Sequence, residues 1–186
     1  MGHEGYRIRT VRADDWPALK ELRLAALSDP AARVAFVSTY EDSSAQADEF
    51  WRGRATPIVE GGNATSLIAA DRDGRWVAML ALLDETGDRA VQDESGDGGA
   101  PQQMHVVSVY VRPEHRGTGV AERLFRAAVD WSWENTEAER VGLWVHSDNV
   151  RARAFYRRIG FAETGETMAF PTRPDELEYE MVLPRP

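Results

Sequence analysis

The chain has 186 residues, 42% of them hydrophobic, which fits one globular domain with a sizeable core. Its net charge of −9 argues against a general nucleic-acid binder, because such proteins need a basic surface to displace counterions from phosphates. The absence of cysteine excludes disulfides, thiolate metal sites and a catalytic cysteine, and the four histidines lack metal-ligand spacing. We therefore expect a single domain over residues 1–186, with no metal and no nucleic-acid partner.

Targeting signals are also missing from the sequence. No apolar run is long enough to span a membrane, and the first residues, "MGHEGYRIRT", lack the apolar core of a signal peptide. We therefore expect a cytoplasmic protein without membrane association.

The first elements in chain order are a strand and a helix. Residues 6–11, "YRIRTV", alternate in polarity as a short strand does. Asp14 or Asp15 can cap the helix that follows, and Pro17 is tolerated in its first turn. Apolar residues recur at helical spacing as far as Leu27.

A second short helix and a hairpin come next. Residues 48–55, "DEFWRGRA", favour a helix, and the apolar runs 64–70 and 76–83 flank the turn-forming "DRDG". The acidic, glycine-rich segment 84–103 has few apolar residues, so we predict a long mobile hairpin loop there.

The C-terminal half alternates strands and helices. Residues 104–111 are almost continuously apolar, as in a strand covered on both faces. An amphipathic helix starts at Val120, and residues 141–145 form another buried strand. Together with a last strand at 178–183, this order predicts an α/β domain with a mixed sheet of six to seven strands and helices on both faces.

The segment "NVRARAFYRRIGF" predicts the last helix. Asn149 opens it, and the side chains that share its apolar face include Phe155 and Tyr156. Gly160 ends it, and Phe161 can pack back on the last turn.

A short turn joins strand 104–111 to the helix at Val120. In "RGTGVA", Arg116 precedes small residues at a helix N-terminus, where unpaired N–H groups and the helix dipole favour a diphosphate. A plain glycine turn is the alternative. The turn lacks the Gly-Lys-Ser/Thr ending of a P-loop, and its third small residue comes too early for a dinucleotide fingerprint.

The pattern that does fit is Arg/Gln-x-x-Gly-x-Gly/Ala, met by Arg116, Gly119 and Ala121. Here the chain resembles the GNAT superfamily of N-acetyltransferases, whose signature grips the pyrophosphate of acetyl-CoA. "VYVRPEHRGTG" is similar to the family's central strand and loop, and "NVRARAFYRRIGF" to its second signature. The resemblance is specific over residues 104–161 and looser before them.

The resemblance implies where acetyl-CoA binds. The expected contacts are the main chain of the central strand, the turn and the start of the last helix: Val109, Tyr110, Val111, Arg116, Gly117, Thr118, Gly119, Val120, Ala121, Asn149 and Tyr156. Tyr156 is the implied general acid, since a phenol stays protonated at neutral pH and can protonate a departing thiolate. A core aromatic is the alternative for Tyr156, and a helix cap for Asn149.

The general base is not marked by any spacing. His105, at the start of the central strand, is one candidate, and a buried structural histidine is its alternative. Glu41, with Asp42, lies where the family builds its acceptor wall, although these acids also fit a solvated loop. Trp51 is an acceptor contact in the same interpretation.

The resulting hypothesis is an acetyl-CoA-dependent N-acetyltransferase. It transfers the acetyl group directly to a primary amine, in our interpretation that of a small molecule, within a ternary complex. The alternatives are acetylation of a protein or peptide, and a catalytically silent acyl-CoA-binding module. The resemblance also allows a homodimer.

Overall fold

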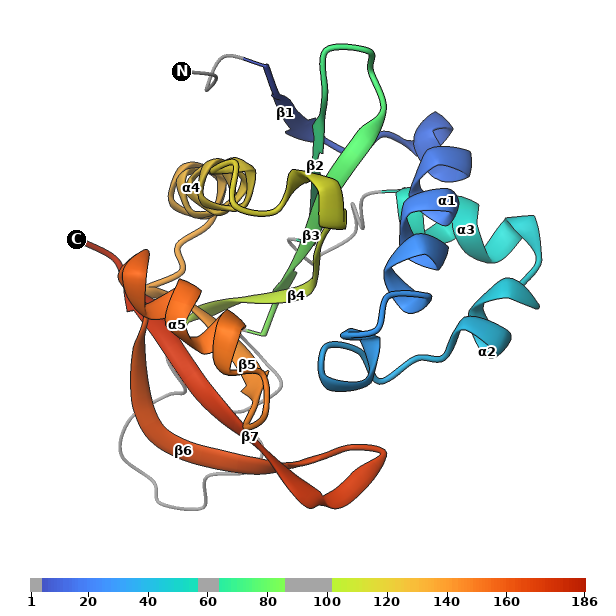
Figure 1. Ribbon diagram of the computed structural model, residues 1–186. Coiled ribbons are helices and arrows are strands. Elements are labelled where there is room, and N and C mark those ends of the chain that lie inside the picture. Colours follow the sequence, from blue (N-terminus) through green and yellow to red (C-terminus); the bar gives the residue numbers. More distant parts are fainter. Residues whose placement is uncertain (1–4, 57–63, 86–101) are drawn as a thin grey trace.

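One mixed sheet organises the molecule. The computed structural model describes residues 5–56, 64–85 and 102–186, and in these residues seven strands form a sheet in the order β1-β2-β3-β4-β5-β7-β6 (Figure 1). Only β4 and β5 run parallel; the other neighbours are antiparallel. The strands are β1 (Arg7–Thr10), β2 (Thr65–Ala70), β3 (Trp76–Asp84), β4 (Gln103–Val111), β5 (Arg140–His146), β6 (Ala162–Phe170) and β7 (Arg173–Pro184).

Helices cover both faces of this sheet, as the sequence predicts (Figure 1). Side chains of α4 and α5 join one hydrophobic core with the central strands, and those of α1 and α3 form a second core on the opposite face. The helices are α1 (Trp16–Leu27), α2 (Tyr40–Ser44), α3 (Asp48–Ala55), α4 (Val120–Asn135) and α5 (Val150–Arg158), with 3₁₀ turns at Ala13–Asp15, Ala32–Val34 and Pro113–His115. Among the described helices, none has both the length and the apolar content that a membrane span requires.

The sequence missed two elements and misplaced several boundaries. Helix α2 and strand β6 were not predicted, and β7 begins five residues before the expected 178. Asp84 and Gln103, the expected ends of the mobile loop, belong to β3 and β4; the rest of the loop lies outside the described residues, apart from Glu85 and Gln102.

The predicted cap of α1 is wrong in its chemistry. Asp15 precedes the helix but makes no side-chain capping bond to it. Its carboxylate instead accepts two hydrogen bonds from the Arg9 guanidinium, at 2.6 and 2.9 Å, and one from the Arg12 N–H. The side-chain bonds from Arg9 are the main reason why the pKa of Asp15 is lowered. Asp15 therefore ties β1 to the start of α1.

The end of α5 follows the prediction closely. Gly160 adopts a φ of +104°, its N–H bonds to the Arg157 carbonyl, and the Phe161 N–H bonds to the Tyr156 carbonyl. This pair of bonds is a Schellman motif, which needs the left-handed conformation that glycine adopts most readily. Phe161 is buried and packs on the same core as Tyr156. The motif therefore fixes where α5 stops and where β6 starts.

Candidate active site

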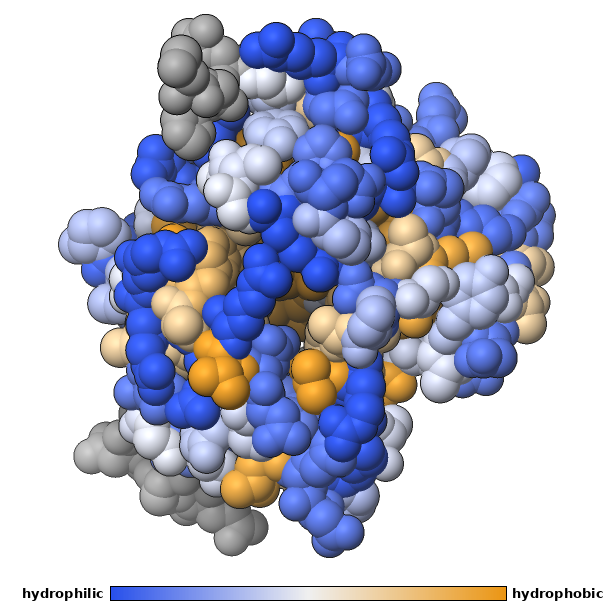
Figure 2. All heavy atoms as spheres, viewed as in Figure 1, coloured by the Kyte–Doolittle hydropathy of each residue, from blue (hydrophilic) through white to orange (hydrophobic). Residues whose placement is uncertain are grey.

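Strands β4 and β5 separate after a short paired region. Their recorded pairs are Gln103 with Arg140, Met104 with Val141, and His105 with Gly142. Past His105, β4 continues to Val111 with no described partner on this side, while β5 pairs onward with β7. One edge of β4 is thus open beside the sheet's centre. Figure 2 shows a hollow with hydrophobic side chains in its depth where Figure 1 shows β4.

A β-bulge lies in the middle of β4. Ser108 has a φ of +59°, and the register with β3 shifts between the pairs Ala81–Val107 and Met79–Tyr110. A bulge exchanges the two faces of a strand. Accordingly Val106 belongs to the core under α4, whereas Tyr110 belongs to the core under α1.

The bulge also decides which amides face the gap. The Arg112 N–H bonds to the Val77 carbonyl at 2.8 Å, so it points towards β3. Because successive N–H groups in a strand point to opposite edges, those of Val111 and Val109 point towards the gap. Two of the three main-chain positions expected to contact the cofactor, Val109 and Val111, therefore direct their N–H groups towards the gap between β4 and β5. The amide of Tyr110, which pairs with Met79, points to β3 instead.

The open edge leads directly into the glycine turn. Gly117 and Gly119 have φ values of +79° and +83°, a region that side chains with a Cβ rarely adopt. The first helical bond at this end of α4 runs from the Arg123 N–H to the Gly119 carbonyl, at 3.1 Å. The N–H groups before Arg123 in the first turn are the ones that an α-helix leaves without internal acceptors. They and the helix dipole form an anion-binding end next to the open strand.

Arg116 is held in place by protein groups. Its Nε donates to the Val111 carbonyl at 3.0 Å, and its Nη2 donates to the Asp29 carboxylate at 2.5 Å. The Asp29 side chain is only 4% exposed, so this ion pair is largely shielded from water. In this arrangement Arg116 braces the turn against the end of α1. Its direct contact with a diphosphate stays a prediction.

Thr118 is braced as well. Its hydroxyl donates to the His115 carbonyl at 2.7 Å and accepts a bond from the Tyr6 hydroxyl at 3.1 Å. The Tyr6 hydroxyl is also 2.9 Å from Nδ1 of His115. The conformation of the turn is therefore supported by a residue that precedes β1.

Helix α5 presents Asn149 and Tyr156 as expected from the second signature. The Asn149 side chain accepts from the Ala152 N–H at 3.3 Å, so it caps the helix. Tyr156 is 7% exposed, and its ring packs against Phe125 and Phe161. Burial raises the pKa of its hydroxyl, so the phenol stays protonated well above neutral pH. This environment is compatible with a core aromatic and with a proton donor.

The two candidate bases occupy different surroundings. His105 is buried where β4 and β5 still pair, with its Nδ1 3.5 Å from a carboxylate oxygen of Glu85. Glu41 lies in the first turn of α2, exposed to solvent. These two residues come from distant elements, and a role for either stays a prediction.

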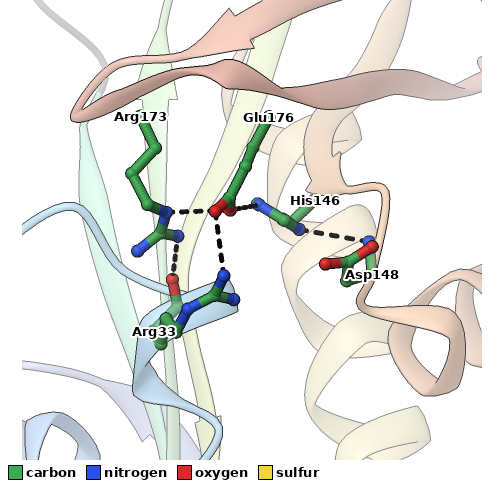
Figure 3. Close-up of polar contacts among 5 residues, drawn as sticks. All are labelled: Arg33, His146, Asp148, Arg173 and Glu176. Atoms are coloured by element: carbon green, nitrogen blue, oxygen red, sulfur yellow. Dashed lines mark hydrogen bonds and ion pairs between the residues drawn. The ribbon is translucent and has the colours of Figure 1, made fainter.

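The carboxylate of Glu176 joins three separate segments of the chain (Figure 3). Glu176 in β7 binds Nε2 of His146 at 2.6 Å, the Arg173 guanidinium at 2.8 Å and the Arg33 guanidinium at 2.8 Å. We call Arg33, His146, Arg173 and Glu176 the Glu176 clamp. It holds the β6–β7 turn against the segment that follows α1.

The contacts of His146 also indicate its tautomer. Nδ1 of His146 accepts from the Asp148 N–H at 3.1 Å, so the ring proton sits on Nε2 and is donated to Glu176. His146 is 1% exposed, and its lone pair is already used. It is therefore a positioning group.

Glu178 is a candidate that the sequence analysis did not single out. It is half-buried on β7, opposite His146 of β5, and makes no ion pair with another described residue. Burial raises the pKa of its carboxyl group. The repeated glutamates in "DELEYE" were readable in the sequence, but nothing local separates this one from its neighbours.

Comparison with known proteins agrees with this geometry. The model of the Acetyltransferase (GNAT) family matches residues 16–161, most of the chain. The chain belongs to the GNAT family of acetyltransferases. Members of this family are acetyltransferases, and the family generally uses acetyl-CoA.

Relatives within the GNAT family act on different amines. Streptothricin acetyltransferase of Streptomyces lavendulae is 32% identical over 120 residues, which cover 62% of this chain and 60% of the relative. Spermidine N(1)-acetyltransferase of Escherichia coli K12 is 32% identical over 60 residues, 32% of each protein. The matched regions are thus less than two thirds of either relative's length.

A solved structure shares the GNAT fold over the whole chain. A GCN5-related N-acetyltransferase from Kribbella flavida has a TM-score of 0.70, with 21% identity and coverage of 99% of this chain and 100% of that one. At this identity the likeness shows the fold alone.

Proposed function

We propose that this GNAT protein transfers an acetyl group from acetyl-CoA to the primary amine of a small molecule, directly and within a ternary complex. The observation that carries the proposal is the continuous path from the open edge of β4 to the left-handed turn at the start of α4. Free strand amides suit the amide-rich pantetheine arm, and a helix N-terminus suits the diphosphate.

Acetyl-CoA, when bound, supplies the thioester carbonyl. The N–H groups of Val109 and Val111 orient the pantetheine arm along β4, and the bulge at Ser108 lies at the inner end of this edge. As the amine nitrogen bonds to the carbonyl carbon and the carbon–sulfur bond breaks, the nitrogen loses one proton and the sulfur gains one. Tyr156 is the proposed source of the sulfur's proton, because its raised pKa keeps it protonated.

The proton from the amine needs an acceptor. We propose Glu178, directly or through water, and keep His105 and Glu41 as competitors. Glu178 makes no ion pair with a described residue, and burial raises the pKa of its carboxyl towards the range in which a base works best. His105 already faces Glu85, and Glu41 is exposed on α2.

A substitution at the turn tests cofactor binding without straining the fold. Because Gly119 has a φ of +83°, a bulky residue there would disturb the backbone as well as the ligand. Ala121 lies in the first turn of α4, where a carboxylate favours the helix. Ala121→Asp should thus fold, and its charge should weaken acetyl-CoA binding in calorimetry more than tenfold.

Ala121→Ser is the matched control, and it should bind acetyl-CoA with nearly unchanged affinity. The activity itself is tested by coenzyme A release with polyamines, amino acids, aminoglycosides and peptides. Equal affinity for acetyl-CoA in the Asp variant would contradict the assigned binding turn. Release only with peptides or proteins would favour the alternative substrate class, and acetyl-CoA binding without release would favour a silent binding module.

A further inference from the structure

A partly open cavity lies on the α1 and α3 side of the sheet. Its volume is about 410 Å³, and it is bounded by α1, α3 and the facing residues of β2, β3 and β4. Val107 and Ser108 line it, so it reaches the bulge at the inner end of the open edge. Most of the other lining side chains are apolar, among them Leu19, Phe50 and Met79. A molecule of amino-acid or dipeptide size fits such a space.

Arg23 brings a buried positive charge into this cavity. It lies on the apolar face of α1, is 8% exposed, and lines the cavity. Its Nη1 is buried with no hydrogen-bond partner among the described residues. The guanidinium stacks over the ring of Phe36, 4.4 Å from its centre. Burial, and then repulsion from Arg54, lowers the pKa of Arg23 to about 10.

Two further donors line the same cavity. Trp51 is 1% exposed, and its Nε1 also lacks a partner among the described residues. Arg54, on α3, makes no ion pair with a described residue, and burial lowers its pKa. No acidic side chain is present among the described lining residues. Buried polar groups are nearly always hydrogen-bonded, so the unpartnered Nη1 of Arg23 and Nε1 of Trp51 call for a ligand that accepts hydrogen bonds. Arg54 is exposed on α3 and adds a second positive charge to the cavity lining.

We propose that the acceptor amine carries a carboxylate, which Arg23 and Arg54 bind while its apolar part fills the rest of the cavity. The inference rests on the proposed function, because it places the acceptor next to the open edge of β4, along which the proposed function lays the pantetheine arm. A planar guanidinium suits a carboxylate, and a dry, apolar surrounding strengthens the pair. The predicted substrate class is an apolar amino acid or a short peptide with a free carboxylate. A polyamine is disfavoured, since its second ammonium would meet two guanidinium groups.

Matched acceptors test the proposal through turnover. L-phenylalanine and phenethylamine differ by the carboxylate alone, and so do L-leucine and 3-methylbutylamine. We expect kcat/KM to be at least tenfold higher for each amino acid than for its decarboxylated partner. Arg23→Met should abolish this preference. Arg52→Met is the matched control: it removes an exposed arginine of the same helix as Arg54, outside the cavity, and should keep the preference.

Direct binding separates this inference from the proposed function. Calorimetry with L-phenylalanine should show binding to the wild-type protein that is lost in Arg23→Met and kept in Arg52→Met. Such binding without coenzyme A release for any amine would support the carboxylate site and overturn the acetyl transfer. Equal turnover of phenylalanine and phenethylamine would leave the acetyl transfer standing and overturn the carboxylate site. Phosphoethanolamine is a third arm: its use in place of the amino acids would assign the cavity to phosphate, against the proposal.

Discussion

Arg23→Met should make the protein more stable, although it removes a charged group from a binding cavity. Burial and the charge of Arg54 disfavour the charged form of Arg23 and lower its pKa to about 10, which corresponds to about 3 kcal/mol at neutral pH. The variant loses the stacking on Phe36, about 1 kcal/mol, and methionine keeps most of the apolar packing of the arginine stem. The net expectation is a gain of about 1–2 kcal/mol in the free energy of unfolding.

Thermal unfolding without ligands measures this gain. For a chain of this size it corresponds to a rise in Tm of about 2–8 °C. Arg52→Met, which removes an exposed arginine paired with Glu49, should change the free energy of unfolding by less than about 0.5 kcal/mol. A lower Tm in Arg23→Met than in the wild type would refute the reasoning, because it would mean that Arg23 has a stabilising partner. A stability gain combined with lost carboxylate binding is the pattern of a group kept for function.

Three further substitutions test other parts of the site and fold. Tyr156→Phe keeps the buried ring, so Tm should stay near the wild-type value while kcat falls roughly 10²-fold; an unchanged kcat with chemistry rate-limiting would reject the acid. Glu178→Gln should remove a rise in kcat/KM with pH through the raised pKa of Glu178 in the wild type, and a persisting rise would point to His105 or Glu41. Asp15→Asn should cost about 1 kcal/mol in urea unfolding at pH 7. That cost should shrink as the pH falls through the lowered pKa of Asp15, and an equal cost at pH 3 would contradict the pairing with Arg9.

Features set by neighbouring residues were the most predictable from sequence. The turn before Val120 and the end of α5 depend on glycines at fixed offsets, and the structure shows positive φ values at Gly119 and Gly160. The bulge at Ser108 was not predictable. Residues 104–111 are almost all apolar, so both faces of the strand carry apolar side chains and the sequence gives no sign of an extra residue. The direction of the Tyr110 amide was therefore missed with it.

Elements without an apolar pattern were also hidden. Every residue of β6 except Phe170 is exposed, so the strand shows no alternation, and it is defined by its pairing with β7. Arg23 differs from these elements, because its unusual position could be read from the sequence. It falls within the apolar stripe of α1, between Leu22 and Ala26, where a charge is unexpected. A charged residue on the buried face of a helix was readable in the sequence, and it is the residue on which the proposed carboxylate site depends.

The Glu176 clamp sets an order of events during synthesis. Arg33 and Glu176 are separated by 143 positions, so their contact cannot form until β7 has left the ribosome. The glycine turn before α4 and its brace from Asp29 are complete much earlier in translation. A nascent chain that lacks β7 would therefore carry the glycine turn, while the segment after α1 would be held by Asp29 and Phe36 but not by the Glu176 clamp. Deleting β7 should loosen the segment that follows α1, far away in sequence, before it affects the turn.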